Sequence, residues 1–164
     1  MNATEHHTAA VSAVEAAGSL VEAASRHLAA RSAEDGRISV TALDRHQVVA
    51  YDLAHAASAA AGCRVMLEYA QHGPLEEKLA SAFIADAIAD IASRLVGRDQ
   101  AWGVEPVMLA SAHQFVTAHR APEFLESLAD ELPRVGTGPP HLPDEFDMVR
   151  DTFHRFAGSA TLVT

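Results

Sequence analysis

The sequence has one cysteine, few aromatic residues and few basic residues, and each of these shortages bears on the fold or on the class of partner that can be expected. Because Cys63 is the only cysteine, no disulfide can form within the chain, which fits a reducing cytoplasm. Phe, Trp and Tyr make up only 5% of the residues although 49% are hydrophobic, so much of the apolar content is alanine. Alanine has the highest helix propensity of all residues. The composition therefore predicts an all-α fold.

The shortage of basic residues narrows the range of partners. The chain has 12 basic and 22 acidic residues, which gives a net charge of −10 at pH 7. Nucleic acids and anionic membranes attract clustered Lys and Arg, so we expect neither as a partner. No run of about 18 apolar residues occurs, so no membrane-spanning helix is expected. The N-terminal segment around His6 and His7 lacks the basic and apolar regions of a secretory signal, and we expect a cytoplasmic protein.

Hydrophobic periodicity predicts the helices. The clearest pattern advances alternately by four and three positions through Val49, Leu53, Ala56, Ala60, Cys63 and Leu67. Capping residues, prolines and glycines then place helices over 9–32, 39–72, 75–95, 106–119, 122–132 and 144–157, the second of them beginning near either Ser39 or Thr41. The buried face of the helix over 75–95 is predicted to comprise Leu79, Phe83, Ile84, Ile88, Ile91 and Leu95. No strand is predicted.

The connections between these helices predict the architecture. The tight turn at Gly73-Pro74 makes the second and third helices antiparallel neighbours. We predict an up-down antiparallel bundle of four to five helices over residues 1–132. Residues 133–143 contain four prolines and two glycines and are typical of a linker. Residues 144–164 would then form the first helix of a following domain.

Two apolar stripes suggest contacts with other helices. The final helix places Phe146, Val149, Phe153 and Phe156 on one face, which we expect to be exposed and to bind a protein partner. The first helix has a narrow stripe of small and aliphatic residues at seven-residue spacing, made of Ala10, Val14, Ala17, Val21, Ala24 and Leu28. This stripe suits close helix pairing, so homodimerisation is a second expected mode of association.

Candidate metal ligands and nucleophiles each have a simpler structural interpretation. Two Asp-x-x-His pairs, Asp52–His55 and Asp151–His154, resemble half of the ligand set of a di-iron bundle, which needs Glu-x-x-His twice and two further Glu. The incomplete set favours a polar helix face. Cys63 lies on an apolar face and is interpreted as a small buried hydrophobic residue.

The remaining short motifs also have no assigned chemistry. His6 and His7 are expected in a solvated N-terminal tail that covers residues 1–8. Gly136-x-Gly138 lacks the preceding strand and the following Lys of a phosphate-binding loop. We therefore assign no catalytic, cofactor-binding or metal-ligating residue.

Two runs carry a resemblance to a known family. The run DRHQVVAYDLAH over residues 44–55 and the run HLPDEFDMVRDTFHRFA over residues 141–157 resemble segments of certain bacterial acyl-CoA dehydrogenases. The likeness extends from about Gly36 to Ala157. In those proteins a helical extension precedes the dehydrogenase body, and the second run is similar to the first helix of that body.

The resemblance implies FAD-dependent α,β-dehydrogenation of acyl-CoA thioesters, an oxidoreductase activity of fatty acid metabolism. The family's flavin lies between a middle β-domain and a C-terminal helical domain, and its catalytic Glu comes late in the chain. This sequence matches neither region, so FAD is expected in the full-length family and not in this chain.

The expected function follows from the resemblance. We expect a non-catalytic helical domain, or a truncated or frame-shifted fragment, of an acyl-CoA dehydrogenase-like flavoprotein, acting in intramolecular or subunit packing. The alternative is a stand-alone helical module for protein interaction or dimerisation.

Overall fold

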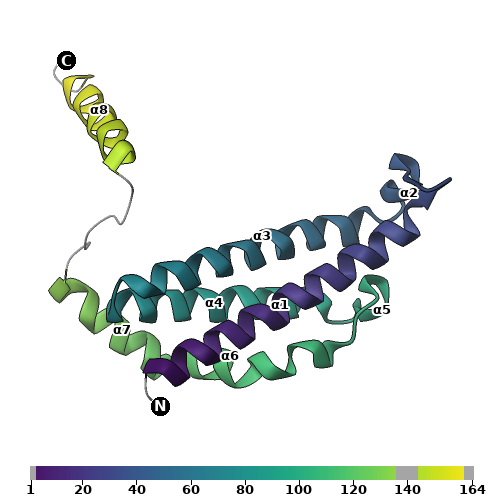
Figure 1. Ribbon diagram of the computed structural model, residues 1–164, viewed down its shortest axis with the longest axis horizontal. Helices are drawn as coiled ribbons and strands as arrows, with labels where there is room; N and C mark the ends of the chain where they lie inside the picture. The colour runs from purple at the N-terminus through teal and green to yellow at the C-terminus, as the bar shows by residue number, and fades with distance from the viewer. Residues whose placement is uncertain (1–2, 136–143, 161–164) are drawn as a thin grey trace. The chain divides into compact units, whose positions relative to one another are not determined.

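The all-α fold is confirmed by a computed structural model, which describes residues 3–135 and 144–160 (Figure 1). The described chain forms two compact units, one over Met1–Asp130 and the other over Glu131–Thr164. The first unit is a helix bundle, and the second contains the helix α8 (Asp144–Ala160).

The bundle consists of four antiparallel helical segments, which we call legs. The first three are α1 (Ala3–Arg31), α3 (Gln47–Tyr69) and α4 (Pro74–Leu95). The fourth leg consists of shorter pieces, α5 (Asp99–Trp102), the 3-10 helix η2 (Pro106–Ala112) and α6 (His113–His119). Figure 1 shows these legs side by side, with α3 against α1 and α4, and η2 against α1.

Helix α1 supplies the centre of the core with small side chains. Ala13, Ala17 and Leu20 are fully buried, and the alanines allow the neighbouring legs to approach closely. The predicted small-residue stripe therefore packs within the chain's own bundle. The helix also begins earlier than predicted, at Ala3, because residues 3–8 continue it and do not form a tail.

A short β-hairpin after α1 was missed by the sequence prediction. It pairs β1 (Ala33–Glu34) with β2 (Arg37–Ile38) in antiparallel register. Asp35 and Gly36 both have positive φ, 51° and 75°, as the two central residues of a type I′ turn require. Two-residue strands are too short to show an alternating pattern, so only the Asp-Gly turn was detectable.

The helix predicted over 39–72 is divided into α2 (Val40–Asp44), α3 and a 3-10 turn, η1 (Ala70–His72). Ser39 caps α2, its Oγ accepting a hydrogen bond from the Ala42 amide at 3.2 Å. Arg45 ends α2 and donates a hydrogen bond to Glu34 of β1 at 3.2 Å. This tertiary contact between the end of α2 and the hairpin accompanies the break before α3.

Helix α4 begins at Pro74, as the Gly-Pro turn indicates, and its Ile84, Ile88, Ile91 and Leu95 are buried. Phe83 was wrongly placed on the buried face, since its side chain is 44% exposed. Its ring covers Gly62 of α3, where an added Cβ would lie 3.3 Å from the ring edge.

The C-terminal part differs from the predicted boundaries by a few residues. Helix α7 (Pro122–Val135) continues through 133–135, the first three residues of the predicted linker. The two compact units divide within α7, between Asp130 and Glu131, where the sequence predicted a boundary at 132. Linker residues 136–143, with the Gly136-x-Gly138 motif, lie outside the described residues, as do residues 1–2 and 161–164.

Candidate functional site

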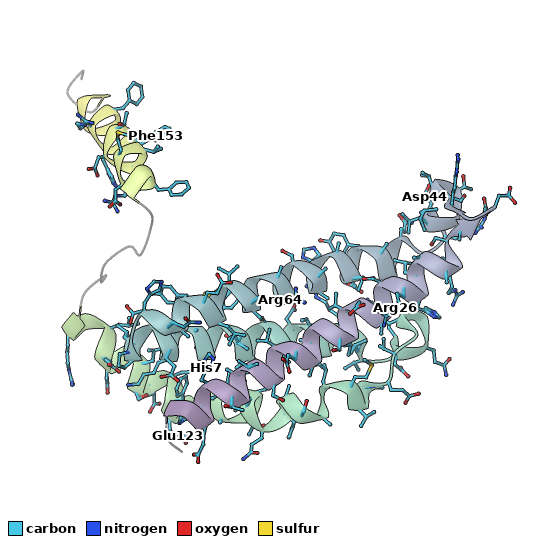
Figure 2. The ribbon with its side chains drawn as sticks, in the orientation of Figure 1. His7, Arg26, Asp44, Arg64, Glu123 and Phe153 are labelled. Carbon is cyan, nitrogen blue, oxygen red and sulfur yellow. The ribbon has the colours of Figure 1, made fainter. Side chains whose placement is uncertain are left out.

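The apolar face of α8 is the feature that the sequence singled out for a partner. Phe146, Val149 and Phe153 are 50%, 51% and 69% exposed, and the exposed Phe156 continues the same face. Their spacing of three, four and three residues keeps them on one side of the helix. The Phe153 ring can be followed on this helix in Figure 2.

The polar side of α8 is held by local interactions. Arg150 Nη1 lies 3.0 Å from Asp147 Oδ1, and its Nη2 lies 3.6 Å from Asp151 Oδ1. The Thr152 hydroxyl donates a hydrogen bond to the Met148 carbonyl at 2.8 Å. These contacts are confined to the polar side of α8. Asp151 is engaged with Arg150, and its predicted partner in a metal pair, His154, is exposed.

Asp52, the carboxylate of the other Asp-x-x-His pair, has a structural role in the bundle. It is only 8% exposed and accepts a hydrogen bond from Arg94 of α4 at 3.1 Å and another from Arg98. The pKa of Arg94 is raised, first by its hydrogen bond to Asp90 and then by Asp52. His55 instead places its ring 4.5 Å from that of Tyr51. The structure therefore does not bring Asp52 and His55 together as ligands.

Cys63 is fully buried in the core, as its place on an apolar face indicates. Burial raises the pKa of its thiol to about 11, because a thiolate would lose its hydration. A nucleophilic cysteine needs a lowered pKa, so this side chain is held in an unreactive form.

A cluster around His119 was not predicted as a unit. His119 is 4% exposed, and its Nδ1 lies 2.9 Å from the Phe115 carbonyl oxygen. Its ring packs against Phe115 at 4.2 Å and against Phe124 of α7 at 4.9 Å between centroids. The ring of His6 from α1 lies 6.0 Å away, so His6 is part of this cluster and does not lie in a solvated tail. The six-residue spacing of His113 and His119 gave no hint of this contact, which comes from distant segments.

The His119 cluster borders a pocket of about 290 Å³ that is also lined by Glu77, Lys78 and Ser81. Burial is the main cause that lowers the pKa of His119, and the nearby His6 lowers it further. The Phe115 carbonyl orients the ring by accepting from Nδ1–H of the neutral form. The ring of His119 joins α6 to α7 through its contacts with Phe115 and Phe124.

The resemblance implies FAD, whose pyrophosphate needs cationic or neutral surroundings. The cleft between α1 and α3 has charged residues in its lining that bear on this requirement. Arg64 lies over Gly18 in a pocket of about 500 Å³ (Figure 2). Glu15 and Glu22 line the same pocket, and their carboxylates would repel the pyrophosphate of a dinucleotide. Arg64 is the single cation that the described residues contribute to the lining against these two carboxylates, so the lining of this pocket does not fit the pyrophosphate of FAD.

The side-chain geometry contains no metal-binding group of three or more His, Cys, Asp or Glu within the described ranges. No helix in the same ranges is long and apolar enough to cross a membrane. No protein-family model, curated protein or solved structure matches this chain.

Proposed function

We propose that this chain is a non-catalytic helical domain of an acyl-CoA dehydrogenase-like flavoprotein and that it packs on the dehydrogenase body through α8. The observation that carries the proposal is the exposed apolar face of α8, formed by Phe146, Val149 and Phe153. The resemblance of the runs over 44–55 and 141–157 supplies the identity of the partner. FAD and the oxidation of acyl-CoA thioesters belong to the body in this proposal, and the complex is cytoplasmic.

The physical support comes from the energetics of a single helix. Helix α8, with 17 residues, is only slightly longer than the roughly 12–15 residues below which an isolated helix is marginal in water, and most helical stability in proteins comes from packing an apolar face. Burying the side chain of a residue such as Phe153 contributes roughly 1.5–3 kcal/mol. Three such side chains on one face supply a binding surface that is suited to a groove between helices.

The first test combines sequencing with a binding measurement. The coding DNA beyond the codon for Thr164 is translated in three frames, and any dehydrogenase body found there is purified separately. Isothermal titration calorimetry then measures its affinity for this chain. We expect a complex that Phe153→Asp weakens at least tenfold. His154→Asp is the matched control, because it adds the same charge to α8 away from the apolar face. Absence of a body in every frame, or equal binding of Phe153→Asp and wild type, contradicts the proposal.

A second candidate function is a stand-alone module that dimerises through α8. Its support is the three-four-three spacing of Phe146, Val149, Phe153 and Phe156, which is the seam of a two-stranded coiled coil. The small-residue stripe of α1 no longer supports dimerisation, because Ala17 is buried in the chain's own core. Ala17→Glu would therefore unfold the bundle and would not test self-association.

Sedimentation velocity at increasing protein concentration distinguishes the two candidates. Self-association that is abolished by Phe153→Asp and retained by His154→Asp supports the dimer. A monomer at every concentration contradicts it and leaves α8 for the dehydrogenase body.

A further inference from the structure

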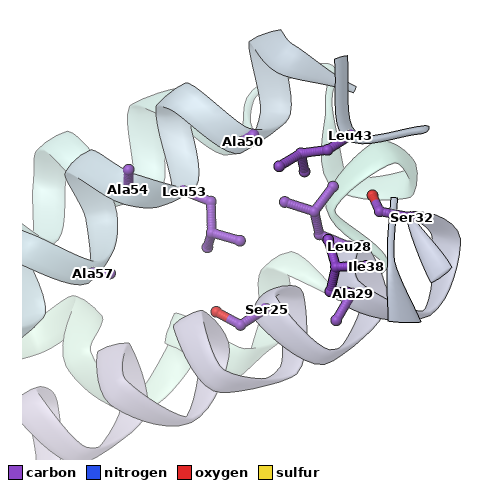
Figure 3. Close-up of a pocket in the computed structure, with 10 residues that line it drawn as sticks. All are labelled: Ser25, Leu28, Ala29, Ser32, Ile38, Leu43, Ala50, Leu53, Ala54 and Ala57. Carbon is purple, nitrogen blue, oxygen red and sulfur yellow. The ribbon is translucent and has the colours of Figure 1, made fainter. Parts of the chain in front are cut away.

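An apolar pocket opens between α1 and α3 near the end of the bundle that carries the hairpin. Its volume is about 340 Å³, and its ten lining residues come from α1, α2, α3 and the segment around the hairpin. None of them is charged. Figure 3 shows Leu28, Leu43 and Leu53 directed toward the same space from α1, α2 and α3.

The pocket is formed by small residues at the surface of α1 and α3, which leave a hollow between the two helices. Ala50, Ala54 and Ala57 line it from α3, and Ala29 lines it from α1. The hairpin and α2 cross the end of the bundle and bring Ile38 and Leu43 to the rim. Leu53 forms the floor of the pocket and is only 5% exposed, whereas Ile38 at the rim is 54% exposed, so the pocket is open to solvent.

Ser32 gives this pocket one unsatisfied polar group. The residue is fully buried, lines the pocket, and its Oγ has no hydrogen-bond partner among the described residues. Its backbone is fully engaged, since its amide donates to Leu28 and Ala29 and its carbonyl accepts from the Ser39 amide. The unsatisfied group is therefore the hydroxyl alone.

Other hydroxyls in the chain show that Ser32 is unusual. A helical Ser or Thr can donate to a backbone carbonyl three or four residues earlier. Ser25, Ser93, Thr117, Ser127 and Thr152 do so at 2.7–2.9 Å. Ser25 lies on the opposite side of the same pocket and is satisfied in this way. The Ser32 hydroxyl, at the wall of the pocket, therefore has unused hydrogen-bonding capacity.

We propose that this pocket binds a small, uncharged aliphatic molecule with one polar head group, which exchanges a hydrogen bond with Ser32. A charged head group is disfavoured, because burial without a partner ion is costly and no lining residue is charged. The pocket is open to solvent on one side, and its volume of about 340 Å³ leaves room for an aliphatic chain of several carbons. A primary alcohol of about six to ten carbons meets both requirements.

The test uses 1-octanol as the probe and the full chain as the protein. Two-dimensional ¹H–¹³C NMR follows the leucine methyl groups during the titration, because Leu28, Leu43 and Leu53 line the pocket. Ala54→Leu fills the pocket from an exposed position of α3, where leucine is a good helix former. Ala61→Leu is the matched control, since Ala61 is exposed two turns further along α3 and does not line the pocket.

The expected result is saturable binding with shifts confined to the pocket leucines. Ala54→Leu should abolish it and Ala61→Leu should retain it. Ser32→Ala should weaken 1-octanol binding by about two- to tenfold, the equivalent of one neutral hydrogen bond. The same variant should raise the Tm of the ligand-free protein, because it removes a buried unsatisfied hydroxyl.

Three results would overturn the proposal. The first is a titration without saturation, and the second is binding that persists unchanged in Ala54→Leu. The third is a Ser32→Ala variant that binds 1-octanol as tightly as wild type.

Discussion

Gly18→Ala tests how α1 and α3 approach each other. Gly18 lies in the middle of α1, and a Cβ at this position would be 2.8 Å from a guanidinium nitrogen of Arg64. That nitrogen is the far end of a long, exposed side chain. Arg64 forms no ion pair within 4.0 Å among the described residues, so its guanidinium can move away without losing a partner.

Two effects of opposite sign decide how Gly18→Ala changes the stability of the bundle. Alanine in place of glycine inside a helix stabilises by about 0.5–1 kcal/mol, because the unfolded chain loses backbone freedom. Forcing Arg64 off its preferred rotamer would cost about 0.5–1.5 kcal/mol, but only if it could not relax. Because the side chain is exposed, we expect the helix term to dominate. The bundle should be stabilised by roughly 0.5 kcal/mol or slightly more.

Urea denaturation followed by tryptophan fluorescence measures this change. Trp102 is the only tryptophan and is fully buried in the bundle, so its emission reports unfolding of that unit. The expected gain corresponds to a rise of roughly 0.2–0.5 M in the urea midpoint. In an Arg64→Met background the same substitution should give the full helix term. A Gly18→Ala protein that is destabilised with Arg64 present and stabilised with Met present would refute the reasoning, since Arg64 would then be fixed in place.

Three further predictions concern single side chains. Burial lowers the pKa of His119 in the folded state. As the pH falls, the unfolded state therefore binds a proton at this side chain before the folded state does. The free energy of unfolding should be highest above about pH 6.5 and should decrease as the pH drops below that value. A His119→Asn variant should lose less stability between pH 7.5 and 5.5, and an equal loss in both proteins would contradict the assignment. Gly103→Ala should destabilise the bundle by at least about 2 kcal/mol in urea titrations, because φ at this position is +65° and the added Cβ would overlap the His27 ring. A near-neutral effect would show that the His27 ring is free to move. With its pKa at about 11, Cys63 should react with a thiol reagent at pH 8 only after unfolding in urea, and rapid labelling of the native protein would disprove its burial.

Much of the fold could be predicted from local patterns. The periodicity through Leu53, Ala56, Ala60 and Cys63 identifies the buried face of α3, and these four side chains are all buried. The Gly73-Pro74 turn fixes the start of α4 and its direction against α3. Such features depend on neighbouring residues in the chain, which is why periodicity and turn chemistry reveal them.

The errors arose where packing between distant segments decided the outcome. Phe83 has the hydrophobicity of a core residue, but it covers Gly62 at the surface of the bundle. His6 was expected in a solvated tail because it lies near the terminus of the chain, but its ring lies beside that of His119, more than a hundred residues away. No local pattern records such a contact.

The sequence by itself determined the helical class, the antiparallel connection of α3 to α4, and the apolar stripe of α8, because these follow from propensity and spacing. Only the tertiary structure decided which polar groups have partners. It joined Asp52 to Arg94 and Arg98, and it buried the Ser32 hydroxyl in an apolar pocket with no partner among the described residues. The physical reason is that burial and hydrogen bonding depend on which surfaces meet, and the residues that meet come from distant parts of the chain.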